Sequence, residues 1–384
     1  MKVARRIQSL PSYLFAELDA KVAAKRAAGI DVISLGIGDP DLPTPPHIVA
    51  ALQLAAADPA THRYPSYYGL PEFREAIAKF YERRFGVLLD PQTEVLPLIG
   101  SKEGLAHLSF AFIDRGDRAL VPDPGYPVYA RSTVLAGGEV VPMALTQDRG
   151  FLPDLATLEV PAGTRLLWLG YPNNPTAAVA DLAFFEEAVG FASRHGLLLG
   201  HDAAYSEITF DGFVAPSILQ VPGARDVALE FGSLSKTYNM TGWRIGYAVG
   251  NRDSIGALGT LKTNLDSGVF NAVQWAAVAA LSGPQECVEE MRAVYQKRRD
   301  AVVSAFLEAG IPIEPPLGSI YVWVPTPTGT SSEGFAEELL DEAGVVVAPG
   351  TGYGARGEGY VRISLTVPED RLAEAMGRIR DRLA

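Results

Sequence analysis

The stretch GSLSKTYNMTGWRIG, residues 232–246, lies between two apolar runs at residues 227–231 and 245–249. Runs of this length beside glycine and polar residues are typical of buried strands, so we expect strand, loop, strand. The polar cluster then lies at the end of a strand. Open α/β sheets place their functional groups at such ends, so the stretch predicts an α/β fold with a site in this loop.

The loop combines one amine with several groups that bind anions. Ser233 and Ser235 flank the approach to Lys236, and Arg244 follows eight residues later. A lysine amine forms an imine with an aldehyde, while hydroxyl and guanidinium groups bind phosphate. The loop therefore suits a phosphorylated aldehyde.

Two other lysine motifs fit this loop only in part. The spacing Ser233-x-x-Lys236 matches the nucleophile motif of penicillin-binding proteins, but the chain has no Ser-Asp-Asn or Lys-Thr-Gly sequence to complete it. A phosphate loop of the Walker type needs glycine before the lysine, where this chain has Ser235. The remaining alternative is that Lys236 is an exposed loop lysine without a catalytic or binding function, and the motifs elsewhere in the chain argue against it.

The composition indicates a large globular protein. The chain has 384 residues, of which 48% are hydrophobic and 20% charged, as expected for two domains. Its net charge of −12 and its lack of basic runs argue against nucleic acid or an anionic membrane as a partner. No apolar run approaches the roughly 18 residues that a membrane span requires.

A few residues constrain targeting, redox state and metal binding. Pro11, Glu17 and Asp19 interrupt the N-terminal region before an apolar signal segment can form, so we expect no signal peptide. Cys287 is the single cysteine, which excludes a disulfide within the chain and suits a reducing compartment. The five histidines show no metal-ligand spacing. We therefore expect a cytoplasmic protein without a metal.

Polar or aromatic motifs also follow other predicted strands. Ser101 and Lys102 follow a strand at residues 95–99 and open a helix, whose free N–H groups suit a phosphate. Tyr126 is held in an extended backbone by Pro127 and can offer its ring face to a heteroaromatic cofactor. Both motifs add cofactor-binding groups to those of the lysine loop.

Two more predicted strands end in polar residues. Asn174 follows a strand at residues 165–169, and Asp202 and Tyr205 follow one at residues 197–199. A turn at the end of the strand can bring Asp202 and Tyr205 onto one side. A carboxylate there can keep a pyridine nitrogen protonated, because a nearby negative charge favours the charged form.

Taken together, these motifs resemble those of the fold-type I, or class I and II, aminotransferases, which use pyridoxal 5′-phosphate. Lys236 has the position of the Schiff-base lysine in that family, and matching motifs extend over most of the chain. The resemblance implies an α/β fold with a large, mainly parallel-sheet domain at residues 45–286. A smaller α+β domain is expected from both termini, residues 1–44 and 287–384.

The resemblance also implies roles for individual residues. The catalytic residues would be Lys236, Asp202 and Tyr205. The cofactor would be bound by Ser101, Lys102, Tyr126, Asn174, Asp202, Tyr205, Ser233, Ser235, Lys236, Arg244 and, from across a dimer interface, Tyr64. The substrate would be bound by Tyr13, Gly38, Lys102, Asn174 and Arg362. Ala177 stands where the family has glycine, and a left-handed backbone at that position would exclude alanine.

Arg362 alternates with apolar neighbours on a predicted strand at residues 360–365. The rigid fork of arginine matches a carboxylate, so Arg362 could hold the α-carboxylate of an amino acid. A structural ion pair is the alternative, and the position of Arg362 in the resembled family favours the carboxylate.

Among the subfamilies, the chain most resembles the LL-diaminopimelate aminotransferases, through residues 10–19, 64–69, 233–246, 263–270 and 357–366. That resemblance implies a homodimer with shared active sites and a role in lysine biosynthesis. Ping-pong amino transfer would connect LL-2,6-diaminopimelate and 2-oxoglutarate with tetrahydrodipicolinate and glutamate.

Alternatives to this function remain open. Aspartate and alanine aminotransferases share most of these motifs, and a carbon–sulfur lyase or a decarboxylating lyase would share every cofactor residue. A cofactor-binding regulator would need a DNA-binding module, and the sequence shows no basic helix-turn-helix extension.

Overall fold

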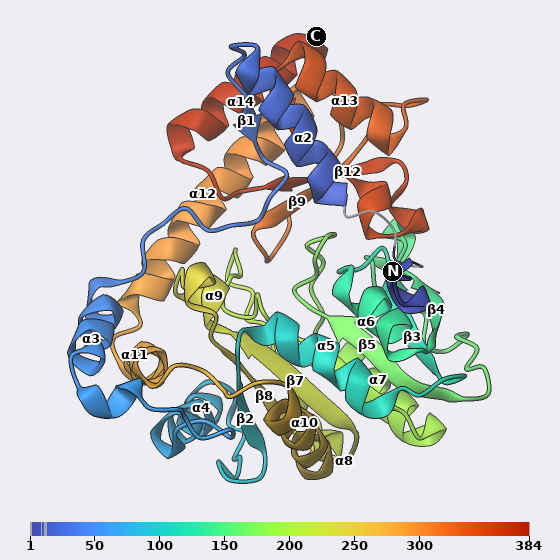
Figure 1. The fold of residues 1–384 in the computed structure, drawn as a ribbon. Helices are drawn as coiled ribbons and strands as arrows, with labels where there is room; N and C mark the ends of the chain where they lie inside the picture. The colour runs from blue at the N-terminus through green and yellow to red at the C-terminus, as the bar shows by residue number, and fades with distance from the viewer. Residues whose placement is uncertain (1, 9, 11–13, 384) are drawn as a thin grey trace.

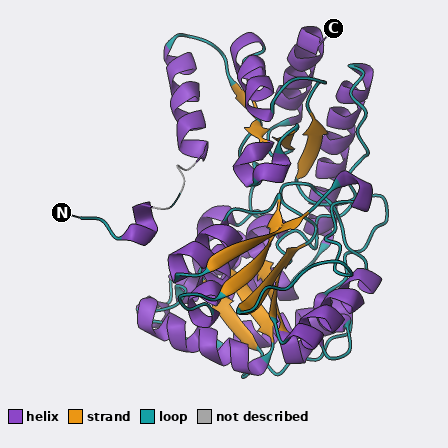
Figure 2. Ribbon diagram, turned by 90° about the vertical axis from the view of Figure 1, so that its right-hand side faces the viewer, coloured by secondary structure: helices purple, strands orange, loops and turns teal. Residues whose placement is uncertain are grey.

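The computed structural model describes residues 2–8, 10 and 14–383. Two bodies of secondary structure lie one above the other in Figure 1. The lower body contains a seven-stranded sheet, and the upper body contains short strands and helices from both ends of the chain. Figure 2 shows the same division after a quarter turn.

The large sheet has the strand order β2-β8-β7-β6-β5-β3-β4. Its strands are β2 (Val95–Leu98), β3 (Arg118–Asp123), β4 (Glu139–Ala144), β5 (Thr164–Gly170), β6 (Leu198–Asp202), β7 (Ala228–Ser233) and β8 (Gly246–Gly250). Strands β3 to β7 pair in parallel, whereas β8 runs antiparallel to its neighbours β2 and β7. The prediction of a large, mainly parallel α/β sheet is confirmed.

Helices cover both faces of this sheet. The helices of the lower body, including those at its flank and at the ends of strands, are α3 (Pro46–Ala56), α4 (Pro71–Phe85), α5 (Ser101–Phe112), α6 (Val128–Ala136), α7 (Leu182–His195), α8 (Ala224–Val227), α9 (Leu234–Thr237), α10 (Arg252–Leu265) and α11 (Asn271–Ser282). Alternate residues of a strand face opposite sides. Leu166 and Trp168 of β5 pack with α5, α6 and α10, while Leu167 and Leu169 pack with α4 and α7. Burial on both faces explains why β5 is a continuous apolar run in the sequence.

The upper body joins segments from both ends of the chain. The strand β1 (Ile33–Ser34) pairs in parallel with β10 (Val345–Val346), while β12 (Tyr360–Ser364) lies between β11 (Ala348–Pro349) and β9 (Tyr321–Pro325). The helices of the upper body are α2 (Leu14–Ala27), α12 (Glu286–Glu308), α13 (Ser332–Glu342) and α14 (Glu369–Leu383), whereas α1 (Arg5–Gln8) lies beside α6 of the lower body. Short 3-10 helices are η1 (Pro59–His62), η2 (Gln147–Arg149), η3 (Ile218–Gln220), η4 (Thr241–Trp243), η5 (Gly350–Tyr353) and η6 (Ala355–Gly357).

The long helix α12 extends from beside α11 in the lower body into the upper body (Figure 1). The domain boundaries predicted at residues 45 and 286 remain predictions. Within the residues that the structure describes, no helix combines the length and the apolar character that crossing a membrane requires.

Candidate active site

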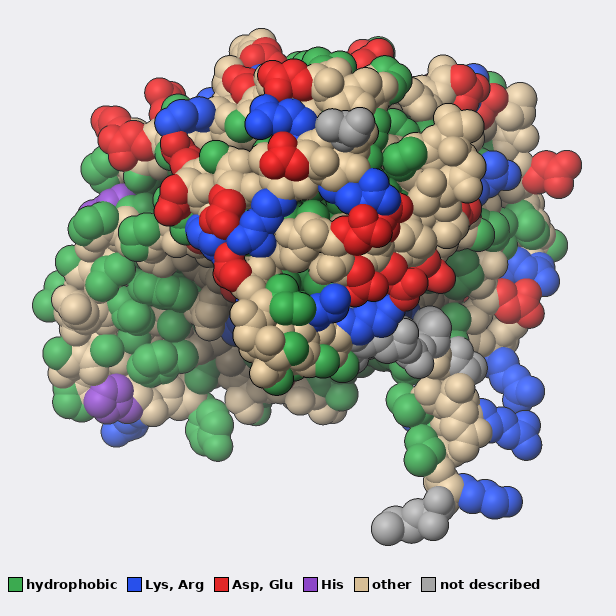
Figure 3. Space-filling view, turned by 90° about the horizontal axis from the view of Figure 1, so that it is seen from above, with side chains coloured by type: hydrophobic (Ala, Val, Ile, Leu, Met, Phe, Trp, Pro, Cys, Tyr) green, Lys and Arg blue, Asp and Glu red, His purple; other side chains and the backbone are tan. Residues whose placement is uncertain are grey.

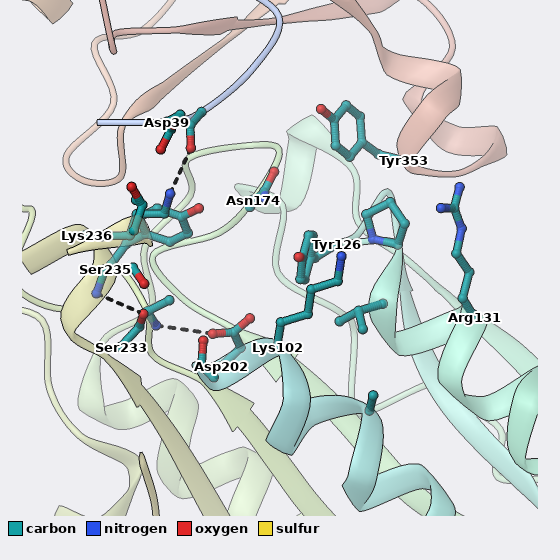
Figure 4. A pocket seen from close by; sticks show the side chains of 18 of the residues that line it. Asp39, Lys102, Tyr126, Arg131, Asn174, Asp202, Ser233, Ser235, Lys236 and Tyr353 are labelled. Carbon is teal, nitrogen blue, oxygen red and sulfur yellow. Dashed lines mark hydrogen bonds between the residues drawn. The ribbon is translucent and has the colours of Figure 1, made fainter. Parts of the chain in front are cut away.

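A cavity of about 550 Å³ is lined by residues from the polar edge of the large sheet and by residues of the upper body. Most of the predicted site residues line it, namely Gly38, Ser101, Lys102, Tyr126, Asn174, Asp202, Tyr205, Ser233, Ser235, Lys236, Arg244 and Arg362. Figure 4 shows this cavity from close by. Tyr64 is not among the lining residues and is 89% exposed. Tyr13 lies outside the described residues.

Lys236 lies in α9, the short helix that directly follows β7. Ser233 caps this helix, because its hydroxyl accepts a hydrogen bond from the backbone N–H of Ser235 at 3.3 Å. The amine of Lys236 donates to the backbone carbonyl of Gly38 at 2.8 Å. Burial lowers the pKa of Lys236 below its ordinary value. More of the amine is therefore neutral and able to attack an aldehyde.

The groups that could hold a phosphate meet at the N-terminus of α5, which begins at Ser101. A β-carbon at Gly100 would lie 2.3 Å from Nη2 of Arg244, and one at Gly246 would lie 2.8 Å from the backbone nitrogen of Ser101. The two glycines therefore let the guanidinium and the helix N-terminus approach each other. With the two serines of the lysine loop, this arrangement fits a phosphate group.

Asp202 is the last residue of β6 and is buried. Its Oδ2 accepts a hydrogen bond from the hydroxyl of Tyr129 at 2.8 Å, and its Oδ1 accepts one from the backbone N–H of Ala204 at 3.2 Å. Burial raises the pKa of Asp202, and the Tyr129 hydrogen bond opposes this rise. A buried carboxylate held by these two hydrogen bonds can keep a protonated ring nitrogen beside it.

Tyr129 was not predicted as a site residue. Its ring stacks on Trp168, with centroids 5.0 Å apart and an interplanar angle of 16°. Its ring also meets Tyr126 edge-on, with centroids 5.8 Å apart. Tyr129 thus supports both the carboxylate and the aromatic side chain that was predicted to stack on a cofactor. Its spacing of three residues from Tyr126 near the start of a helix is the signal that could have placed both rings on one face.

Arg362 lies in β12 with only 3% of its surface exposed. Its Nη1 donates to Oδ1 of Asn174 at 2.9 Å, and its Nη2 donates to the backbone carbonyl of Gly36 at 2.7 Å. The guanidinium also lies over the ring of Tyr321, 3.9 Å from its centroid. Among the described residues, Nε of Arg362 has no hydrogen-bond partner. A buried donor without a partner fits an arginine that binds a ligand carboxylate.

Asn174 accepts this hydrogen bond through its oxygen, so its amide N–H groups remain available as donors to a ligand oxygen. Three residues later, Ala177 has a φ of 58°, in the left-handed region. The prediction that such a backbone would exclude alanine is therefore wrong. The strain costs about 1 kcal/mol, and the buried turn offsets it, because the N–H of Ala177 donates to the carbonyl of Asn173 at 3.0 Å.

Tyr205 and Tyr321 form a pair of buried hydroxyls 3.2 Å apart. Burial, followed by the nearby Tyr321, raises the pKa of Tyr205 well above its ordinary value. Its hydroxyl therefore keeps its proton and can donate a hydrogen bond to a ligand. Tyr321 belongs to β9 and was not predicted, because in the sequence it is one aromatic residue within an apolar strand.

Basic side chains gather on one part of the cavity wall. Burial lowers the pKa of Lys102, and the nearby Arg131 and Arg244 lower it further. Arg131 lines the cavity on α6 and was also missed in the sequence. Figure 4 shows Lys102 and Arg131 on the same side of Tyr126, away from Lys236. A ligand with a second acidic group would find cations there.

Outside the cavity, Glu103, His107 and Asp266 bring three possible metal ligands together. The amine of Lys262 already donates to Glu103 at 3.2 Å and to Asp266 at 2.9 Å. Nδ1 of His107 also lies 2.9 Å from Glu103. The ligand atoms of this cluster therefore already have partners within the protein.

The chain matches the family described as Aminotransferase class I and II over residues 30–379. It is 56% identical to an LL-diaminopimelate aminotransferase of Desulforudis audaxviator, over 98% of this chain and 97% of the relative. It is 55% identical to an LL-diaminopimelate aminotransferase of Moorella thermoacetica, over 99% of this chain and 98% of the relative. The substrate-bound BacF structure from Bacillus subtilis superimposes with a TM-score of 0.94 at 40% identity, covering 99% of this chain and 98% of that chain.

Proposed function

The chain belongs to the class I and II aminotransferases, and from this premise we propose that it connects LL-2,6-diaminopimelate and 2-oxoglutarate with tetrahydrodipicolinate and glutamate. As a member of this family it is an enzyme that exchanges an amino group between amino acids and keto acids, with pyridoxal 5′-phosphate as cofactor. The observation that carries the proposal is one cavity lined by a lysine amine, an aspartate carboxylate and an arginine guanidinium. The LL-diaminopimelate aminotransferases at 55% and 56% identity support the substrate.

The residues of the cavity fit this cofactor. The close approach of Arg244 to the N-terminus of α5, which two glycines permit, suits its phosphate. Asp202 would hold the ring nitrogen, Tyr126 would cover the ring face, and Asn174 and Tyr205 would donate to the ring oxygen. When bound, pyridoxal 5′-phosphate supplies an aldehyde for the amino group and a ring that withdraws electrons from the substrate.

Lys236 is the residue suited to moving the proton. Its lowered pKa leaves a neutral amine that can take the proton from the α carbon of the substrate and deliver it to the C4′ carbon of the cofactor. Asp202 and Tyr205 keep opposite protonation states for this task. The first stays ionised beside a positive ring nitrogen, and the second keeps its hydroxyl proton as a donor.

Arg362 is the residue suited to the α-carboxylate, since its fork is already oriented by Asn174 and by the carbonyl of Gly36. Lys102 and Gly38 would contact the rest of the substrate. The basic side chains of the cavity favour a substrate with a second carboxylate. A distal amine of the substrate would need a hydrogen-bond acceptor, which Lys102 cannot supply because its ammonium only donates. Closure of Tyr13 over the far end remains part of this proposal.

A single-turnover comparison tests the substrate. LL-diaminopimelate, its meso isomer, lysine, aspartate, alanine and glutamate are each mixed with enzyme in the aldehyde form, and conversion of the cofactor is followed by absorbance. A site that pairs distal polar groups rejects analogues without them by about 10⁴-fold. If aspartate or alanine reacts with higher efficiency than LL-diaminopimelate, the substrate is wrong and aminotransfer remains. Analysis of the products separates aminotransfer from lyase chemistry.

The homodimer also belongs to this proposal. Apolar side chains exposed on α3 and α11 support it, because Leu54 is 79% exposed and Trp275 37% exposed beside a groove of about 720 Å³. Figure 3 shows hydrophobic side chains gathered on the left flank, where Figure 1 places these helices. An exposed apolar surface of this kind marks an interface. We assign it to a second copy, with Tyr64 reaching the cofactor phosphate of the partner.

A cytoplasmic location completes the proposal. The single cysteine, Cys287, suits a reducing compartment.

A further inference from the structure

Tyr321 contacts two residues of the candidate active site, and no function has yet been assigned to it. It is the first residue of β9 and is 3% exposed. Its hydroxyl lies 3.2 Å from that of Tyr205, and its ring carries the guanidinium of Arg362 at 3.9 Å. One side chain thus touches both the predicted partner of the ring oxygen and the predicted partner of the α-carboxylate.

The backbone of Gly38 completes the surroundings of this hydroxyl. A β-carbon at Gly38 would lie 2.0 Å from the Tyr321 hydroxyl oxygen, so only glycine leaves room for it. The carbonyl of the same glycine accepts the hydrogen bond from Lys236 at 2.8 Å. The Tyr321 hydroxyl is therefore held in a confined position beside Tyr205, close to the reactive amine.

The direction of the hydrogen bond follows from the number of protons. Tyr205 has one hydroxyl proton, and with the cofactor bound that proton goes to the ring oxygen. The oxygen of Tyr205 is then left as an acceptor, so Tyr321 is the donor of the 3.2 Å contact. Hydrogen bonds in such a chain polarise one another, and each strengthens the next.

We propose that Tyr321 is a positioning residue that donates its hydroxyl proton to Tyr205 and so strengthens the hydrogen bond from Tyr205 to the ring oxygen of the cofactor. The inference rests on the proposed function in that pyridoxal 5′-phosphate binds at Lys236 and that Tyr205 donates to its ring oxygen. A stronger hydrogen bond at the ring oxygen draws electron density from it. The oxygen then holds less tightly the proton that it shares with the lysine nitrogen, so this proton dissociates at lower pH.

The test is a pH titration of the bound cofactor's absorbance without any substrate. Tyr321→Phe keeps the ring under Arg362 and removes only the hydroxyl. We expect its titration midpoint to rise by about half a pH unit to one pH unit, the effect of one net hydrogen bond. Tyr205→Phe should raise the midpoint further, because it removes the contact with the ring oxygen itself.

The double variant and a matched control show whether Tyr321 acts on the cofactor through Tyr205. In the Tyr205→Phe background, Tyr321→Phe should cause no additional shift, because its effect passes through the Tyr205 oxygen. Tyr295→Phe is the control, since Tyr295 lies in the same hydrophobic cluster, is fully buried, and has a hydroxyl that finds no hydrogen-bond partner among the residues that the structure describes. Its midpoint should equal that of the wild type.

Two results would overturn the inference. The first is an unchanged midpoint in Tyr321→Phe, with cofactor bound and the thermal unfolding midpoint near that of the wild type. The second is a shift of equal size in the Tyr205→Phe background, which would mean that Tyr321 acts on Lys236 directly. Neither titration result depends on which substrate the enzyme uses, because no substrate is present. A wild-type protein that binds no cofactor would instead refute the proposed function.

Discussion

The hydroxyl of Tyr129 donates a 2.8 Å hydrogen bond to Asp202, so the carboxylate at the end of β6 is oriented by a residue from α6. The stacked indole of Trp168 fixes the phenol ring in turn. The orientation of Asp202 therefore depends on packing beneath the cavity as well as on the cavity wall itself.

Replacing Tyr129 by phenylalanine tests this dependence. Burial raises the pKa of Asp202, and the variant loses the hydrogen bond that opposes the rise. In its proposed role Asp202 must be ionised, so the acidic limb of the kcat/KM profile should move to higher pH, by about one unit. The profile is measured from about pH 4, near the pKa of an unperturbed carboxyl group, to about pH 9.

Tyr171→Phe is the matched control, because Tyr171 is also buried and its hydroxyl donates to the carbonyl of Phe151 at 2.9 Å, away from Asp202. Its acidic limb should stay where it is in the wild type. An identical shift in both variants would assign the effect to general loss of a buried hydroxyl.

Asp202→Asn should lower kcat by several orders of magnitude while phosphate anchoring stays largely intact. The amide keeps the size of the side chain but removes the negative charge that would hold the ring nitrogen protonated. Steady-state kinetics and equilibrium dialysis of the cofactor measure the two effects separately. Rates near those of the wild type would refute the assignment of Asp202.

Lys236→Ala should abolish turnover, while the protein folds and binds pyridoxal 5′-phosphate noncovalently. In the wild type, borohydride reduction followed by peptide mapping should place the label on Lys236. The lowered pKa of Lys236 supports this, because its amine is neutral at lower pH than an ordinary lysine.

A second buried lysine provides the control within the same map. Lys262 is 1% exposed, but its amine is paired with Glu103 and Asp266. It should remain unlabelled, since its amine already donates to both carboxylates and is not free to approach the cofactor. A label on Lys262 or on any other lysine in place of Lys236 would contradict the prediction.

Mixing two inactive variants tests the shared site of the homodimer. In a heterodimer of Tyr64→Phe and Lys236→Ala protomers, a Tyr64 that acts on the partner concentrates both lesions in one site and leaves the other intact. Activity should be partly restored on mixing. If heterodimers form, Tyr64→Phe alone is inactive and no activity returns, Tyr64 acts within its own chain.

The sequence was informative wherever one residue follows a predicted strand. Asn174, Asp202 and Lys236 were found in that way, because parallel strands deliver their ends to one edge of the sheet. The structure brings all three to the same cavity. The mainly parallel sheet was predicted from the same pattern and is confirmed.

Residues that act through side-chain contacts between distant segments were not predictable. The spacing of Tyr129 from Tyr126 could place the two rings side by side, but nothing local shows which polar group the buried hydroxyl of Tyr129 or Tyr321 will meet. Tyr205 and Tyr321 are 116 residues apart in the chain. The backbone of Ala177 was missed for another reason, because hydrogen bonds of a buried turn outweighed a local preference.

The glycine beside Lys236 limits how this enzyme can vary. Any side chain at Gly38 would collide with the Tyr321 hydroxyl, and the carbonyl of Gly38 must stay within reach of the lysine amine. Relief of the collision by a smaller residue at position 321 would remove the hydroxyl next to Tyr205. A substitution at Gly38 therefore disturbs Tyr321 as well, so mutational tolerance at residue 38 should be low, although glycine has no functional group of its own.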